Sequence, residues 1–197
     1  FSSVEHGIMY DTRDSRLTPT KGYFARLATN FAGLGGDVYS VKNILSGAYH
    51  WTPREGFLVT LGGRTGYVVA IQDDVLLSER FFVGGRDLRG FAPGGVGPRD
   101  VSTDDSLGGE WMYSGTLELG FPLGLPSELG VSGRVFTDVG SAGAIATNRS
   151  GIEDTGSLRA AAGFGITWKS PFGPLGLDFG IPIVKESFDE TEIVRIN

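Results

Sequence analysis

Arg89 is the residue of this sequence whose type and surroundings best suit a specific polar contact. It stands in the run Leu88-Arg89-Gly90-Phe91, at the centre of a glycine-rich stretch. A guanidinium group is always charged, and its planar fork of N–H donors matches a carboxylate in a bidentate pair. An arginine held inside a protein is costly unless acidic groups match its charge. The chemistry indicated here is therefore ion pairing, with no covalent step.

The other candidate sites are weaker. The glycine pairs of this stretch lack the Lys-Ser/Thr signature of a phosphate-binding loop. His6 and His50 are isolated, with no metal-ligand spacing around them. Asp100, Asp104 and Asp105 lack EF-hand spacing, which favours a solvated acidic loop over a cation site. No serine–histidine–acid set or paired catalytic carboxylates stand out, so we predict no metal, no cofactor and no enzyme activity.

The stretch around Arg89 runs from Glu79 to Asp100 and reads ERFFVGGRDLRGFAPGGVGPRD. Six glycines and two prolines make it irregular, and it is too long for a tight turn. It also carries Phe81, Phe82 and Phe91, which a solvated linker would not need. We predict that this loop folds back into a β-barrel and that Arg89 contacts the inner wall. The alternative is a solvated arginine in an exposed loop.

Composition limits the class of protein. The 197 residues are 40% hydrophobic and 20% charged, so the chain is not disordered. A net charge of −6 argues against a nucleic-acid-binding surface. No apolar run approaches the roughly 20 residues of a transmembrane helix. The 32 glycines are more than twice the usual share of about 7% and suggest strands with crowded or bent positions.

Apolar and polar residues alternate along most of the chain, which is typical of β-strands. In the segment 111–121, for example, Leu117 and Leu119 lie on one face and Thr116 and Glu118 on the other. The pattern predicts nine strands, with Pro53 closing the third: 4–12, 23–31, 38–51, 57–69, 111–121, 129–138, 158–168, 175–181 and 192–197.

The alternating segments indicate an all-β fold, and more specifically a transmembrane antiparallel β-barrel, whose strands need about 9–11 residues. Charged residues in the middle of the polar faces, such as Arg64 and Arg134, fit a water-filled interior. Aromatic residues near strand ends fit the interfacial girdles of such barrels: Tyr23, Trp51, Tyr67, Trp111 and Trp168. The alternative is a soluble β-sandwich, which rarely needs so much glycine opposite its core face.

The barrel hypothesis assigns residues to each side of the wall. The residues predicted to face lipid are Leu117, Leu119, Val135, Phe164, Ile166, Leu177 and Phe179. On the inner side, Gly163, Gly165, Gly176 and Gly180 are predicted to leave room for the folded-in loop.

The loop carries a recognisable motif. The run RFFxGG…LRGF…GGVGPRD resembles the characteristic loop of the BamA-type family, the superfamily of outer-membrane barrel-assembly proteins and bacterial surface antigens. That superfamily includes the organellar import barrels and the two-partner secretion pores. Four further segments resemble family strands in the same order: YDTRDSRLTPTKGYFARLATNF, SGTLELGFPLG, VFTDVGSA and FGPLGLDFGIPI. The resemblance covers nearly the whole chain.

This resemblance implies a fold and a set of contacts. Residues 1–197 would form the later part of a sixteen-stranded barrel, with residues 79–110 as a long in-folded loop. The family's periplasmic N-terminal domains would precede Phe1, and the chain would stop within the last strand. The loop arginine of the family pairs with acids on the inner wall. Glu118 and Asp138 match those positions, and the choice between a contact to one acid or to both stays open.

The resemblance also implies a function, which is the folding and insertion of β-barrel proteins into the bacterial outer membrane. The expected partners are the lipid bilayer, nascent outer-membrane β-barrel proteins and accessory assembly lipoproteins that bind the upstream domains. The alternative is a polypeptide translocation pore of the same superfamily, such as a TamA-like barrel or a two-partner secretion transporter. The upstream domains would distinguish the two.

Overall fold

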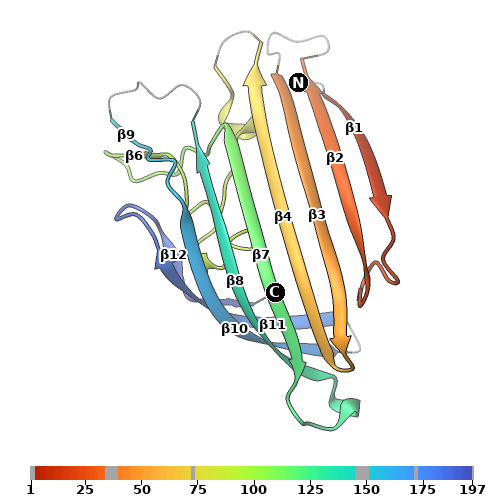
Figure 1. Cartoon of the computed structure of the whole chain (residues 1–197). Helices are drawn as coiled ribbons and strands as arrows, with labels where there is room; N and C mark the ends of the chain where they lie inside the picture. Colours follow the sequence, from red (N-terminus) through yellow and green to blue (C-terminus); the bar gives the residue numbers. More distant parts are fainter. Residues whose placement is uncertain (1–2, 34–39, 72–73, 145–150, 171–172, 197) are drawn as a thin grey trace.

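The chain forms one nine-stranded antiparallel sheet with a long loop folded against one side (Figure 1). The figure shows the computed structural model, which describes residues 3–33, 40–71, 74–144, 151–170 and 173–196. Each strand pairs with the next one along the chain, so β1 and β13 are the edges of the sheet. The strands are β1 (Ser3–Asp11), β2 (Gly22–Ala32), β3 (Ser40–Arg54), β4 (Phe57–Ala70), β7 (Trp111–Pro122), β8 (Val131–Gly143), β10 (Arg159–Ser170), β11 (Gly173–Val184) and β13 (Val194–Ile196). The predicted all-β fold is confirmed.

The remaining elements are short. Strand β5 (Gly90–Phe91) pairs with β12 (Thr191–Glu192), and β6 (Arg99–Asp100) pairs with β9 (Ile152–Glu153). Two 3-10 helices, η1 (Leu77–Glu79) and η2 (Ser127–Leu129), lie in connections. Among the described residues, no helix is long and apolar enough to cross a membrane.

Several strand boundaries differ from the sequence prediction, and three of the differences have an identifiable local cause. Pro53 does not end the third strand, because β3 accommodates it at a register shift between Trp51 and Arg54. Leu129 belongs to η2, and β8 begins only after Gly130 turns the chain with a φ of +62°. Glu192 pairs with the loop and not with the sheet. The predicted strand positions 38–39 and 197 lie outside the described residues.

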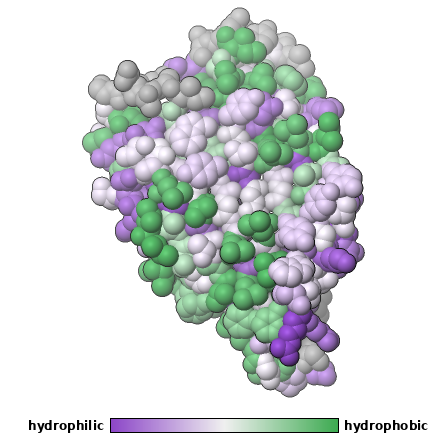
Figure 2. Space-filling model, in the orientation of Figure 1, coloured by the Kyte–Doolittle hydropathy of each residue, from purple (hydrophilic) through white to green (hydrophobic). Residues whose placement is uncertain are grey.

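The side of the sheet away from the loop, called the outer face here, is apolar. All seven residues predicted to face lipid lie on it, and Leu117, Val135, Phe164 and Ile166 are exposed. Apolar and weakly polar residues cover most of the face seen in Figure 2. Monomeric soluble proteins rarely expose apolar patches of this extent, so this face needs an apolar environment such as lipid.

The opposite side, called the inner face, forms the hydrophobic core together with the loop. In Figure 1 the loop between β4 and β7 lies on the far side of the sheet. Its apolar residues pack on side chains from four strands, and the fully or almost fully buried members are Val68, Val83, Leu88, Phe91, Val96, Met112, Ala142 and Ala161. Burying one large apolar side chain stabilises a fold by roughly 1.5–3 kcal/mol. The loop is therefore part of the folded core.

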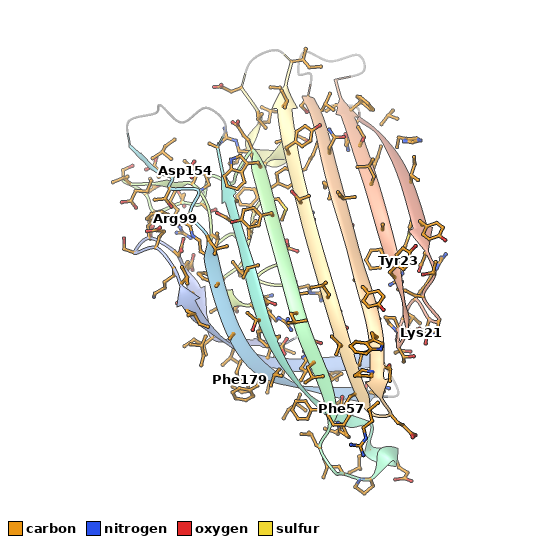
Figure 3. All side chains as sticks on the ribbon, viewed as in Figure 1. Lys21, Tyr23, Phe57, Arg99, Asp154 and Phe179 are labelled. Atoms are coloured by element: carbon orange, nitrogen blue, oxygen red, sulfur yellow. The ribbon has the colours of Figure 1, made fainter. Side chains whose placement is uncertain are left out.

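The two ends of the sheet have different connections. Lys21 and Phe57 lie near one end of the sheet, whereas Arg99 and Asp154 lie near the end that carries the long loop between β4 and β7 (Figure 3). In the β1–β2 turn, the carboxylate of Asp14 accepts hydrogen bonds from the hydroxyl of Thr20 and from the N–H groups of Ser15, Thr20 and Lys21. These bonds, that from the Thr20 hydroxyl above all, hold the pKa of Asp14 below its ordinary value.

The two-faced sheet predicts the effect of a charge on the outer face. Leu119→Arg in the membrane-embedded protein should destabilise it by about 2–4 kcal/mol if the position lies near the bilayer midplane. Spin labels at position 119 and at Ser114, on the inner face of the same strand, provide the measurement. We expect a lipid-soluble relaxer to reach the label at 119 and a water-soluble one to reach the label at 114. The reverse pattern would invert the assignment of faces.

Candidate functional site

The candidate site is the place where the LRGF motif of the loop meets the inner face. Leu88 and Phe91 are fully buried, and Gly90 begins strand β5. Gly90 has a φ of +94°, a conformation that side-chain-bearing residues rarely adopt, and a Cβ atom there would lie 3.1 Å from the Cβ of Ala161. Gly180 of β11 lies directly beneath, where a Cβ would be 2.5 Å from the backbone nitrogen of Gly90. This approach of loop to sheet requires glycine on both sides.

Asp138 of β8 is the main partner of Arg89. The Nε and Nη2 atoms of Arg89 donate to Oδ2 and Oδ1 of Asp138 at 2.8 and 2.9 Å, which is the bidentate geometry. The backbone N–H of Arg89 also donates to Oδ2 at 3.1 Å, and the hydroxyl of Thr116 donates to Oδ1 at 2.6 Å. Asp138 is only 1% exposed, so these four hydrogen bonds replace its water and satisfy both of its oxygens.

Three further groups surround the guanidinium. Its Nη1 donates to Oε2 of Glu118 at 2.6 Å, and its Nη2 donates to the hydroxyl oxygen of Thr116 at 2.9 Å. The ring of Phe136 lies against the guanidinium plane, with 3.5 Å from Cζ to the ring centroid. Burial lowers the pKa of Arg89, but hydrogen bonds and charge from Asp138 and Glu118 outweigh burial and leave the pKa raised. The structure therefore brings Arg89 together with both acids.

Strand register explains why residues so distant in the sequence meet here. Thr116 is the cross-strand neighbour of Asp138, and Glu118 is the neighbour of Phe136. Phe136 in turn is opposite Gly163, which is opposite Gly180. Thr116, Asp138, Glu118 and Phe136 thus lie in two adjacent rows that run across the strands of the inner face.

A second ion pair adjoins the first. Arg134 donates from Nε to Oδ1 of Asp178 at 2.7 Å, and Nη1 of Arg89 lies 3.8 Å from Oδ2 of Asp178. Asp178 is 1% exposed, so the site combines two arginines with three carboxylates. Sequence reasoning did not assign Asp178, Thr116 or Phe136. The available signal for Asp178 was its place on the polar face of the LDFG strand.

The four inner glycines make room for different groups. Gly180 accommodates the loop backbone, and a Cβ on Gly163 would collide with the Phe136 ring and with the carbonyl oxygen of Phe179. At Gly165 a Cβ would instead collide with the Asp178 carboxylate, and at Gly176 with the Arg134 guanidinium. Among these four glycines, only Gly180 lies directly against the loop backbone. The prediction that all four make room for the loop is therefore wrong for Gly163, which accommodates the Phe136 ring, and for Gly165 and Gly176, which accommodate the second ion pair.

The remaining polar candidates form no comparable cluster. His50 lies 3.1 Å from the hydroxyl of Thr60 through Nδ1, as expected of a polar strand position. Asp100 accepts hydrogen bonds from Ser102 and Thr103 in a surface turn. No group of three or more residues suited to hold a metal ion occurs in the part of the chain that the structure describes.

One protein family matches the part of the chain that contains both the sheet and the loop. The Omp85 superfamily domain matches residues 2–197. The chain belongs to the Omp85 superfamily. One relative in this superfamily, the outer membrane protein assembly factor BamA of Neorickettsia risticii, is 32% identical over 196 residues, covering 98% of this chain and 26% of the relative. A SAM50-like protein of Schizosaccharomyces pombe is 28% identical over 206 residues, covering 95% of this chain and 41% of that protein.

A solved structure in the superfamily shows the same arrangement of strands. The crystal structure of BamA from Haemophilus ducreyi lacking POTRA domains 1–3 matches with a TM-score of 0.83 and 25% sequence identity. The match covers 98% of this chain and 41% of the other. The chain spans about a quarter of the length of the bacterial relatives it matches, at 26% and 23% for two BamA proteins.

The geometry around Arg89 predicts unequal couplings to the two acids. Removal of Arg89 or of Asp138 should cost on the order of 1.5–3 kcal/mol of stability, because each loss leaves a buried charge unmatched. A double-mutant cycle between positions 89 and 138 should give a larger coupling than one between 89 and 118, since Glu118 is more exposed and accepts one bond. Arg89→Lys should rescue only part of the loss. Couplings near zero in both cycles would contradict a stabilising contact.

The contact between Gly90 and Gly180 predicts a selective effect of one methyl group. Gly180→Ala should loosen the loop, because the nearest atoms to the new Cβ are backbone atoms of Arg89 and Gly90 that cannot turn aside. Gly176→Ala is the matched control on the same strand, since its Cβ meets only the end of the Arg134 side chain. Limited proteolysis of the loop between residues 81 and 91 measures the difference. Equal protection in both variants would contradict the assignment of Gly180.

Proposed function

We propose that this chain is part of an outer-membrane protein assembly factor, which folds β-barrel proteins and inserts them into the bacterial outer membrane. The observation that carries the proposal is the match across 98% of the chain to a protein with that printed name, at 32% identity. A second BamA, from Nitratidesulfovibrio vulgaris, matches at the same identity across 92% of the chain. The apolar outer face agrees with a place in a membrane.

Residues 1–197 belong, in this proposal, to the later part of a larger barrel. The sheet has two edges, β1 and β13, whose unpaired backbone groups lipid cannot satisfy. Further strands of the same protein would pair with those edges and close the barrel. The 41% coverage of the Haemophilus ducreyi structure supports this reading. Residues 79–110 form the in-folded loop of that barrel.

The proposed role of the LRGF motif is to hold the barrel wall in one shape, without covalent chemistry. Leu88 and Phe91 supply the apolar contacts, and Gly90 permits the close approach to the sheet. Arg89 ties β7 to β8 through Glu118 and Asp138. The proposed partners are the lipid bilayer, nascent outer-membrane β-barrel proteins and accessory assembly lipoproteins recruited by domains outside these residues.

A folding assay tests this function. The intact protein reconstituted in lipid vesicles should accelerate the folding of a urea-unfolded outer-membrane β-barrel, followed by the heat-resistant electrophoretic mobility of the folded product. Arg89→Ala should reduce the acceleration, because the loop loses its charged contact to the wall. Arg26→Ala is the control, since Arg26 pairs with Glu5 on strands distant from the loop.

The same vesicles distinguish assembly from translocation. An assembly factor leaves the substrate folded in the bilayer, whereas a secretion pore delivers polypeptide to the other side. Protease added outside the vesicles, with and without detergent, separates these products. Soluble substrate protected inside the vesicles, with no acceleration of barrel folding, would replace the proposed function by the translocation alternative.

A further inference from the structure

The chain that leads into the last strand is hydrogen-bonded to the loop motif. Strand β12 pairs antiparallel with β5, so that Thr191 lies opposite Phe91 and Glu192 lies opposite Gly90. Ile193 then carries the chain to β13, which begins at Val194 and joins the sheet. The LRGF motif therefore contacts both the inner wall, through Arg89, and the segment that precedes β13.

Glu190 extends this second contact. The N–H of Ala92 donates to the carbonyl of Glu190 at 3.0 Å, and the N–H of Glu190 donates to the carbonyl of Gly95 at 3.0 Å. The carboxylate of Glu190 also accepts a bond of 3.0 Å from Nη2 of Arg99, whose side chain is 5% exposed. A Cβ on Gly95 would collide with the Glu190 carbonyl, so the loop backbone and this segment are in close contact.

Strand β13 contributes a third contact to the loop. The guanidinium of Arg195 donates to Oε2 of Glu192 at 2.6 Å. The same guanidinium lies against Gly85 of the loop, where a Cβ would be 3.0 Å from Nη2. Gly85 has a φ of +64°, so a side chain there would be strained as well as crowded.

Pairing between β11 and β13 starts at Ile193 and Val194, and Pro182 explains why it does not start earlier along the chain. The paired residues are 177–179 of β11 and 194–196 of β13, followed by a bond of 2.8 Å from the Gly180 N–H to the Ile193 carbonyl. Backbone N–H groups two residues apart in a strand point to the same side. The next donor on this edge of β11 would be residue 182, which is proline and has no N–H.

Side-chain direction opposes a longer ladder as well. In the register of β11 and β13, Glu192 would lie opposite Ile181 if the ladder continued. Ile181 is 57% exposed on the apolar outer face, so the carboxylate of Glu192 would be placed there too. In the observed structure Glu192 instead pairs with β5, and its carboxylate forms an ion pair with Arg195.

We infer that docking of the loop and pairing of the last strand with β11 form one coupled unit. The loop holds residues 190–192, and this contact sets the point at which β13 begins. Pro182 makes the strand depend on the loop, because the edge of β11 offers no donor at the next position. Coupling of this kind is reciprocal, so loss of the β11–β13 ladder also weakens the loop contact. The inference concerns the chain's own strands and does not require the proposed function.

Disulfide trapping in the intact protein tests the coupling, since this chain contains no cysteine. The pair Leu177→Cys and Ile196→Cys reports the β11–β13 ladder, because these residues are cross-strand partners. The pair Ala92→Cys and Glu190→Cys reports the loop contact. Arg89→Ala should slow disulfide formation several-fold at both pairs, although the hydrogen bonds and ion pairs of Arg89 go to β7, β8 and β11 and not to the described residues of β13. Arg26→Ala should change neither rate.

Two further variants keep the test decisive if Arg89→Ala impairs folding. Glu190→Ala removes only the ion pair with Arg99 and should slow the 177–196 disulfide to a smaller degree. Pro182→Ala restores a donor to the edge of β11, so in that background loss of Arg89 should slow the 177–196 disulfide less. Unchanged 177–196 rates in Arg89→Ala and Glu190→Ala, with the 92–190 disulfide slowed in Arg89→Ala, would overturn the coupling. An equal effect of Arg89→Ala with and without Pro182 would overturn the role of the proline.

Discussion

The contact of Arg89 with Asp138 is the constraint on which the rest of the structure depends. An aspartate that is 1% exposed in the middle of a strand is tolerable only with its hydrogen-bonding capacity filled, and Arg89 supplies three of the four bonds. Glycine at positions 90 and 180 lets the loop backbone come close enough for this contact. The loop conformation, the glycines at positions 90 and 180 and the buried acid therefore require one another.

The charged contact and the apolar contacts have different consequences for the loop. Pairing of buried charges contributes little net stability, because removing two ions from water offsets most of their attraction. Burial of Val83, Leu88, Phe91 and Val96 stabilises the docked loop by roughly 1.5–3 kcal/mol for each side chain, before the cost of ordering the chain is subtracted. Apolar burial thus supplies most of the attraction, and Arg89 determines where on the inner face the loop can lie.

The sequence predicted the strands and their faces well, because alternation is a local property. It also indicated a folded loop, since Phe91 in a glycine-rich stretch needs a partner. Contacts between strands were harder to predict, because they depend on the register of the strands. Alternation shows which face a residue lies on, but it does not show how the turns set that register. For this reason the sequence did not distinguish Asp178 from the other polar-face residues. It also assigned Gly163, Gly165 and Gly176 to the loop, although they accommodate side chains of the sheet. Membership of Glu118 and Asp138 in one site rested on the family resemblance.

Every strand of the sheet has two sequential neighbours except the edge strands β1 and β13. The edge strand β13 is the one that the loop contacts. At β13 the chain approaches the sheet over the docked loop, where Thr191 and Glu192 pair with β5 before Val194 pairs with β11. The contacts of residues 190–192 with the loop therefore bear on where β13 begins. Because Arg89 holds the same loop on Asp138, its charge pairing at the wall reaches the start of β13 through hydrogen-bonded backbone. The loop that stabilises the wall thereby also influences the start of this edge strand.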